Sequence, residues 1–204
     1  VGDYLFASKW SYGFSGASLP YDHKFGDGRL FLRLPDRGDV VIFKHPVDRT
    51  DYVKRVIGLP GDTVQVVNGV LHLNGEPVPK VRVADAVFPI AASGHCREER
   101  FVERRADGSF ACRYPQFRET LPSGVSYNVL DLGLEPQDTT EPVIVPEGRL
   151  FMMGDNRDNS ADSRVEGGIG QIPFSYVKGR ASVIWISFGG KAGIRFERIF
   201  RSVK

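Results

Sequence analysis

Short apolar runs, each bounded by glycine, proline or asparagine, recur along the chain. Val40–Phe43 is an unbroken apolar run of strand length that Pro46 ends, and its lack of alternation predicts a strand buried on both faces. The runs at 64–67 and 70–73 are separated by Asn68-Gly69, which tolerates the positive φ values of a type I′ turn and predicts a hairpin. Further strands are expected within 2–7 and at 52–58, 150–153 and 179–187. Long amphipathic helix patterns are missing, so we predict a mainly β protein with a core of antiparallel sheets.

The middle of the chain differs in character from both ends. From Pro77 to about Pro142 charges cluster, apolar content falls, and both cysteines are found. We therefore expect a β core built from residues 1–76 and 143–204, split by an insertion subdomain of short strands at 77–142. Residues 11–37 are rich in Gly, Ser and Pro without periodicity, which predicts a loop or a short hairpin.

Composition narrows the class of protein. The 204 residues, 41% hydrophobic and 25% charged, exclude a disordered chain and suit one domain with an insertion. Lys plus Arg number 27 against 25 for Asp plus Glu, and this near balance gives no support for nucleic-acid binding. No apolar run approaches the ~18 residues of a membrane-spanning helix. The two cysteines lack metal-ligand spacing, so we expect neither a metal nor any other cofactor.

One lysine interrupts an apolar strand. Within 51–57, alternation places Tyr52, Lys54 and Val56 on the same face of the strand. Burial lowers the pKa of a lysine, and a neutral amine can act as a general base. The segment by itself leaves two interpretations open, a buried catalytic amine or a solvent-facing lysine on an edge strand.

A dense polar loop at 154–164 directly follows the apolar run 150–153. Its order Asp-x-Asn-x-Asp suggests a calcium-binding loop, and a solvated turn is the plainer interpretation. An EF-hand loop needs Gly at its sixth position and Glu at its twelfth. Counted from Asp155 these positions hold Ser160 and Glu166, so the glycine is missing and we expect no metal.

Four segments together resemble the boxes of type I signal peptidases, the bacterial Ser/Lys endopeptidases that remove leader peptides from exported proteins. Gly154–Arg164 matches the box Gly-Asp-Asn-Arg-Asp-Asn-Ser-x-Asp-Ser-Arg position for position. Asp51–Asp62 matches the box that holds the general-base lysine, and Arg37–Pro46 matches the box before it. Gly2–Gly13 is similar to the strand that follows the nucleophile box. The resemblance implies a signal-peptidase-like β core and does not extend to the middle insertion, which varies in such proteins.

The nucleophile of that family is not found in the sequence. It lies in a Ser-Met-x-Pro-Thr-Leu box that ends shortly before the Gly-Asp of Gly2-Asp3, so we expect the serine a few residues upstream of Val1. Neither Ser8 nor Ser11 has such a context. The family's membrane anchor is also expected upstream. The resemblance thus implies the catalytic region of an inner-membrane protein that faces the periplasm, a region unable to cleave by itself.

The resemblance also implies a role for each matched residue. Lys54 would take the proton of the upstream serine, and Ser160 would orient the lysine. Asp162 and Arg164 would pair and hold the loop in shape, with Asp155 as support. Substrates would be signal peptides with small residues at the first and third positions before the cut, bound as an added strand. The residues expected to line the peptide path, with plain core packing as the alternative for its walls, are Leu5, Ile42, Asp51, Tyr52 and Val53.

Two further expectations follow from a setting at the periplasmic membrane surface. Aromatic side chains near the boxes suit a membrane interface, with core packing as the alternative; they are Trp10, Phe14, Trp185 and Phe188. An oxidising compartment favours a Cys96–Cys112 disulfide, the alternative being two thiols too far apart to bridge.

Two functions of other classes stay open. A peptide-binding module that never cleaves would account for the missing serine. A self-cleaving Ser/Lys regulatory protease of the SOS-repressor kind shares the chemistry, but it would need a DNA-binding module and lacks the 154–164 box.

Overall fold

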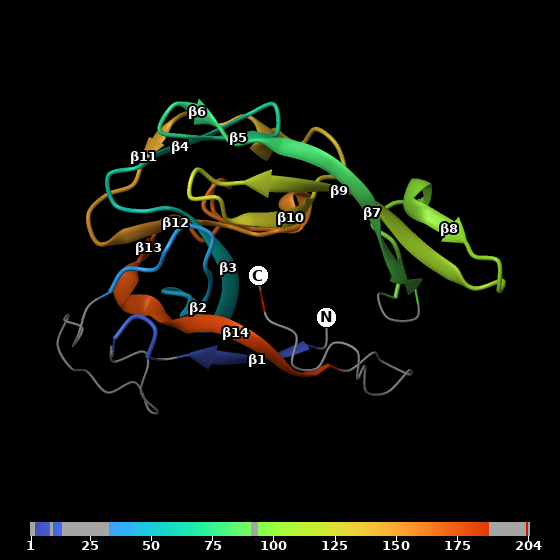
Figure 1. The fold of residues 1–204 in the computed structure, drawn as a ribbon, viewed down its shortest axis with the longest axis horizontal. Coiled ribbons are helices and arrows are strands. Elements are labelled where there is room, and N and C mark those ends of the chain that lie inside the picture. The colour runs from blue at the N-terminus through green and yellow to red at the C-terminus, as the bar shows by residue number, and fades with distance from the viewer. Residues whose placement is uncertain (1–2, 9, 14–32, 91–93, 188–202, 204) are drawn as a thin grey trace.

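Three antiparallel sheets form the part of the chain that the computed structural model describes, residues 3–8, 10–13, 33–90, 94–187 and 203 (Figure 1). All strand pairs between named strands are antiparallel. The helical elements of these residues are short 3₁₀ turns: η2 (Glu99–Phe101), η3 (Pro136–Asp138), η4 (Arg157–Asn159) and η5 (Phe174–Tyr176). The prediction of a mainly β, antiparallel fold is therefore confirmed.

The first sheet has six strands, and several of them come from the matched boxes of the sequence. In spatial order they are β1 (Asp3–Ser8), β14 (Val177–Ser187), β2 (Val40–Lys44), β3 (Asp51–Gly58), β12 (Arg149–Met153) and β13 (Ile172–Pro173). Strand β12 pairs with β3 only between residues 55 and 58. In the described structure the first half of β3, residues 51–54, therefore pairs with β2 alone.

The other two sheets come from the middle of the chain. One contains β10 (Ser126–Leu130), β9 (Phe110–Thr120), β7 (Lys80–Pro89) and β8 (Val102–Arg104), with β8 paired to β9. The other contains β11 (Val143–Ile144), β4 (Thr63–Val67), β5 (Val70–Leu73) and β6 (Glu76–Pro77).

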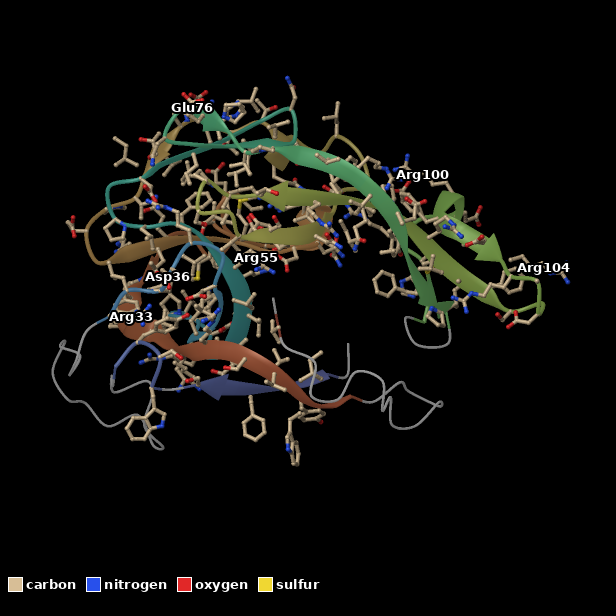
Figure 2. The ribbon with its side chains drawn as sticks, in the orientation of Figure 1. Arg33, Asp36, Arg55, Glu76, Arg100 and Arg104 are labelled. Atoms are coloured by element: carbon tan, nitrogen blue, oxygen red, sulfur yellow. A yellow bond between two sulfur atoms is a disulfide. The ribbon has the colours of Figure 1, made fainter. Side chains whose placement is uncertain are left out.

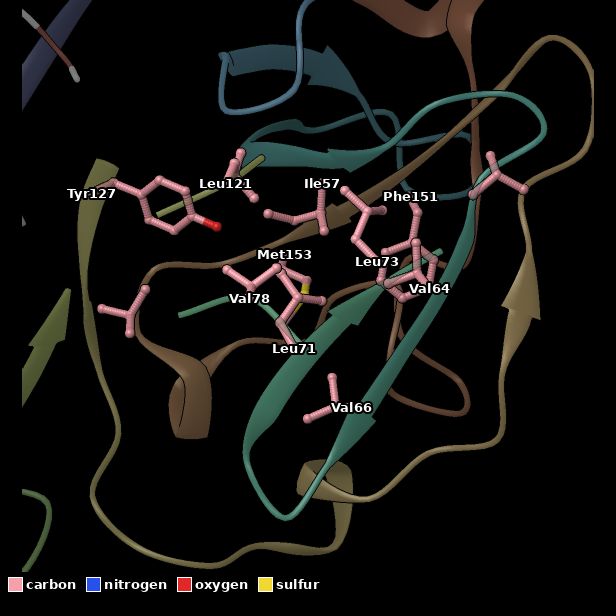
Figure 3. Close-up of a cluster of buried hydrophobic side chains, with 12 residues drawn as sticks. Ile57, Val64, Val66, Leu71, Leu73, Val78, Leu121, Tyr127, Phe151 and Met153 are labelled. Atoms are coloured by element: carbon pink, nitrogen blue, oxygen red, sulfur yellow. The ribbon is translucent and has the colours of Figure 1, made fainter. Parts of the chain in front are cut away.

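Strand β3 contributes to two hydrophobic cores at once. Because successive side chains of a strand point to opposite faces, Val56 packs into one core with Phe43 while Ile57 packs into the other. The second of these cores lies between the three sheets and includes Leu71, Leu121 and Met153 (Figure 3). Burial on both faces fixes the register of β3, because a slip of one residue would exchange the two sets.

The β4–β5 hairpin forms as predicted. Val67 pairs with Val70, and the two turn residues adopt positive φ, 48° at Asn68 and 77° at Gly69. Both values are those of a type I′ turn, whose twist matches that of the flanking strands.

The expectation of short strands in the insertion is wrong. β7 has 10 residues and β9 has 11, and together with β8 they project from the body of the molecule as a long ribbon (Figure 1). Most side chains of β7 and β9 are half-exposed or exposed, so these strands accommodate charged residues among apolar ones. The high content of charged residues therefore did not indicate how long the strands are. The inner end of the same sheet is buried, since Leu121 and Tyr127 belong to the shared core.

A disulfide joins Cys96 to Cys112, with the two sulfur atoms 2.10 Å apart. Cys112 lies within β9 and is buried, whereas Cys96 lies in the loop before η2. The bridge ties that loop to the sheet of β7, β8, β9 and β10.

Candidate active site

Lys54 and Ser160 meet at the end of residues 51–54, the part of β3 that in the described structure pairs with β2 alone. Lys54 lies opposite Val41 of β2, half-buried, and its Nζ donates a hydrogen bond to Ser160 Oγ over 2.6 Å. The two residues are 106 positions apart in the chain. The sheet therefore brings together the two polar segments that the sequence singled out.

The loop that carries Ser160 is closed at its base on β12. Ser163 exchanges two bonds with Met152: its backbone N–H donates to the Met152 carbonyl, and its Oγ accepts from the Met152 N–H, each over 3.0 Å. The chain between these residues includes η4 and turns back toward Lys54. Ser160 therefore lies in a loop whose two ends are held together by hydrogen bonds.

Gly154 is required by the closeness of this contact. A Cβ added there would lie 2.2 Å from Ser160 Oγ and 3.4 Å from Lys54 Nζ. A side chain at this position would therefore force Ser160 or the backbone of residue 154 to shift. The sequence showed Gly154 only as part of a matched box, and nothing in its local pattern marked this role.

Asp162 and Arg164 form a fully buried ion pair beneath the loop. Arg164 Nε donates to Asp162 Oδ1 over 3.0 Å and Arg164 Nη2 to Oδ2 over 2.9 Å. The Gly154 backbone N–H also donates to Asp162 Oδ2, over 3.0 Å. Burial acts to raise the pKa of Asp162, but the bonds from Arg164 prevail and lower it, so the carboxylate stays charged.

The pKa of Lys54 is lowered from its ordinary value. The main cause is burial, which disfavours the ammonium; Asp162 acts in the opposite direction, Arg164 in the same direction, and Asp155 again opposes. Among the described residues neither carboxylate forms an ion pair with Lys54. Burial therefore shifts Lys54 toward its neutral form, which is the form that a general base requires.

Arg55, the residue after Lys54, was missed by the sequence analysis. It is 2% exposed and binds Asp155 through two parallel bonds, Nε–Oδ1 at 2.8 Å and Nη2–Oδ2 at 2.7 Å. It also donates to the Gly38 carbonyl, and its guanidinium lies 4.1 Å from the Tyr127 ring centroid. Figure 2 shows Arg55 in the interior, between β3 and the sheet of β9 and β10. The sequence did offer a signal for it, because Arg55 is a second charged residue within an otherwise apolar strand.

Residues 1–186 match the family described as signal peptidase, peptidase S26. The chain belongs to this family. A signal peptidase I of Rickettsia prowazekii (strain Madrid E) is 37% identical, in an alignment that covers 91% of this chain and 66% of that protein. One from Rickettsia bellii (strain OSU 85-389) is also 37% identical and covers 98% and 72%. The chain thus spans less than two thirds of the first of these relatives. A crystal structure of a signal peptidase I from Enterococcus faecalis V583 matches at 24% identity and a TM-score of 0.40, over 74% of this chain and 98% of that one.

The residues expected to line a peptide path in this signal peptidase family member lie on the first sheet. Ile42 and Val53 are cross-strand partners, and Val53 is 43% exposed. Tyr52 stacks on Phe43 at the edge of one core and donates from its hydroxyl to Asp48. Asp51 pairs with Lys178 of β14 over 2.7 Å. Leu5 lies on β1, opposite Ile184, with β14 between it and β2.

The aromatic residues predicted for a membrane surface divide into two groups. Trp10 and Trp185 are exposed, by 78% and 53%, so core packing is excluded for both. Phe14 and Phe188 lie outside the described residues. Phe6 is exposed as well and contacts Trp185 edge-on, with ring centroids 6.0 Å apart. No helix in the described structure is long and apolar enough to cross a membrane.

The carboxylates of Asp131, Asp138 and Asp158, the last of them in the 154–164 loop, approach one another within 4.8 Å. Lys80 pairs with Asp131, Arg164 lies 3.7 Å from Asp138, and backbone N–H groups donate to Asp138 and Asp158. These partners already bind several of the carboxylate oxygens that would have to coordinate a metal ion. The expectation of no metal stays a prediction.

Gly154→Ala should lower the free energy of unfolding by about 1–3 kcal/mol, because the new methyl group overlaps Ser160. In a Ser160→Gly background the same substitution should be milder by about 1 kcal/mol, since most of the overlapping atoms are gone. Urea denaturation of the four proteins of this cycle measures the difference. Equal effects in both backgrounds would contradict the assigned contact.

Lys54→Met should stabilise the folded chain near neutral pH. A free lysine titrates near ~10.4, and Lys54 titrates lower when folded. Below the folded pKa both states are charged, so burial of the ammonium destabilises the chain in full. Between the two pKa values only the unfolded state binds the proton, stability rises with pH, and above ~10.4 the destabilisation is gone.

The gain from Lys54→Met should therefore shrink as pH rises through that window. Denaturation midpoints measured from neutral to alkaline pH test it, with Lys178→Met as the control, because that lysine is paired with Asp51. Parallel pH dependences for wild type and Lys54→Met would show that Lys54 titrates like a free lysine.

Proposed function

We propose that this chain is the catalytic region of a signal peptidase I that removes N-terminal signal peptides from exported proteins by a Ser/Lys mechanism. The observation that carries the proposal is the contact between Lys54 Nζ and Ser160 Oγ, 2.6 Å long and half-buried, in a chain of this family. The whole activity is proposed for the protein that includes the segment upstream of Val1, where we place the nucleophilic serine.

In the proposed reaction the neutral amine of Lys54 accepts the proton of the serine hydroxyl as the serine oxygen attacks the scissile carbonyl carbon. The tetrahedral intermediate collapses when the C–N bond breaks, and Lys54 returns the proton to the leaving amine. Lys54 then deprotonates a water molecule, which attacks the acyl-enzyme ester. As the ester C–O bond breaks, Lys54 returns this proton to the serine oxygen and the acid product leaves. Ser160 keeps the amine aimed and, being neutral, adds no charge that would favour the ammonium.

The signal peptide is proposed to bind as an added strand beside the first half of β3. In the described structure Asp51–Lys54 pairs on only one side, with β2, and its other edge offers backbone donors and acceptors next to the lysine. Ile42 and the half-exposed Val53 form a shallow apolar surface that suits small side chains. Leu5, Asp51 and Tyr52 are proposed as further contacts of the peptide.

The membrane surface is the second proposed partner. Tyr4, Phe6, Trp10 and Trp185 are all more than half exposed and come from β1, β14 and the turn after β1. Aromatic side chains of this kind favour the interfacial region of a bilayer. The Cys96–Cys112 bridge supports an oxidising compartment. We propose an inner-membrane protein whose catalytic domain faces the periplasm, with no nucleic-acid partner.

Lys54→Ala in the protein that includes the upstream serine should lower kcat by about 10²–10⁴-fold, the usual contribution of a general base. Lys54→Arg should fail equally, because a guanidinium keeps its proton. Ser160→Ala should lower kcat by about 10–100-fold, since it only orients the base. Cleavage of a synthetic signal peptide with alanine at the first and third positions before the cut measures all three variants.

Near-normal turnover by Lys54→Arg would show that another group is the base. Lys178→Arg is the matched control, because this lysine lies on the same sheet but pairs with Asp51. A protein that binds the peptide and never cleaves it would instead be the peptide-binding module.

Phe6→Ser with Trp185→Ser should reduce the fraction of the 204-residue chain that floats with phospholipid vesicles by about 10-fold, as the loss of two interfacial aromatic contacts predicts. Phe110→Ser with Leu134→Ser is the control, since both side chains are exposed but lie in the insertion and the loop after β10. Flotation that is unchanged by the first pair, or equally reduced by both pairs, would contradict a membrane surface at β1 and β14.

A further inference from the structure

A buried ion pair links the insertion to the loop that carries Ser160. Arg157 begins η4, three residues before Ser160, and its side chain is 3% exposed. Its Nη2 donates to Oε2 of Glu119, a fully buried residue of β9, over 2.5 Å. Within the described structure Glu119 is the only carboxylate that forms an ion pair with Arg157.

The backbone of Arg157 is held by the Asp162–Arg164 ion pair. Its carbonyl accepts a bond from Arg164 Nη2 over 2.7 Å, and the same nitrogen donates to Asp162. Arg157 is therefore fixed through its side chain by the insertion and through its carbonyl by Arg164. A continuous path of contacts runs from β9 to the loop between Gly154 and Arg164.

Glu119 gives Arg157 a carboxylate of its own, while the nearby carboxylate of Asp155 is bound by Arg55. Burial acts to lower the pKa of Arg157, but Glu119 foremost, then Tyr127 and more weakly Asp155, act against it, and the pKa is raised. Asp155 is already bound through both oxygens by Arg55. Without Glu119, the buried charge of Arg157 would lose the one carboxylate with which it pairs in the described structure.

A contribution to stability does not account for this arrangement. The desolvation of a buried pair offsets much of its Coulombic attraction, so that apolar residues of similar volume often serve as well. What apolar residues cannot supply is a directional hold on the turn that ends at Ser160. The position of the pair, and not its strength, is the informative feature.

We propose that Glu119 is a positioning residue for the catalytic base: through Arg157 it fixes η4 so that Ser160 stays on Lys54 and keeps water from the amine. The inference rests on the proposed Ser/Lys mechanism. It makes the insertion a working part of the active site.

The test is the titration of Lys54 in the 204-residue chain, followed by pH-dependent acylation of the amine and peptide mass spectrometry. In Glu119→Gln the turn loosens, water reaches the amine, and its pKa returns toward the ordinary value. Labelling of Lys54 near neutral pH should then fall about tenfold, as one pKa unit implies. Glu103→Gln is the control, because its pair with Arg113 lies on the same sheet but is exposed, and it should leave the labelling unchanged.

Glu119→Leu combined with Arg157→Met separates positioning from folding. This double variant removes both buried charges at once, so it should fold even where Glu119→Gln leaves Arg157 unpaired and fails. The loss of Lys54 labelling should persist in it. A folded variant of either kind with the wild-type labelling profile would overturn the proposal.

Cleavage kinetics add a second readout in the protein with the upstream serine. The acid limb of the kcat/KM profile should move to higher pH together with the labelling profile. A loss that is equal at every pH would assign Glu119 to structure alone. Because the labelling needs no substrate, its result stands even if the protein cleaves no signal peptide, so the two proposals fail separately.

Discussion

A lysine amine that is held partly out of water, and that no carboxylate of the described residues contacts, is the constraint on which the site depends. Two acids lie near Lys54, and each is engaged elsewhere, Asp162 by Arg164 and the Gly154 N–H, Asp155 by Arg55. An acid bonded directly to the amine would favour the ammonium and remove the base. The two arginines are thus part of the electrostatics of Lys54, although neither touches it.

The fold explains why this balance is rigid. β3 is buried on both faces beyond Lys54, so the lysine cannot shift along the sheet without displacing Val56 and Ile57 from two cores. The partner loop is closed at its base by Ser163 on Met152 and is held from behind by β9 of the insertion. The site is assembled from three sequence regions, and each is fixed by packing that extends well beyond the polar residues.

The sequence predicted those parts that depend on local pattern. The Asn68-Gly69 turn, the strand at Val40 and the polar loop after Met153 all follow from short-range rules, and the matched boxes located Lys54, Ser160, Asp162 and Arg164. The roles of Gly154 and Glu119 could not be predicted, because they come from contacts between distant segments. Gly154 is needed only because Ser160 returns to it in space, and Glu119 is a charged residue in a strand whose burial no alternation revealed. The long strands of the insertion were missed for a related reason, since half-exposed strands tolerate charge.

The half of β3 that pairs on one side only has a further consequence, for the solubility of the protein. An edge left open for an incoming strand is equally open to the edge of another copy of the chain, the usual start of sheet-to-sheet aggregation. Here the open stretch begins with the charged Asp51, whose carboxylate is about half exposed, and ends at Lys54. In-register parallel pairing of two such edges would place the Asp51 carboxylates of the two copies next to each other, and like charges directly opposite are destabilising, whereas a peptide with small neutral side chains brings no such charge. Asp51 thus disfavours this pairing with a second copy without disfavouring the binding of a peptide.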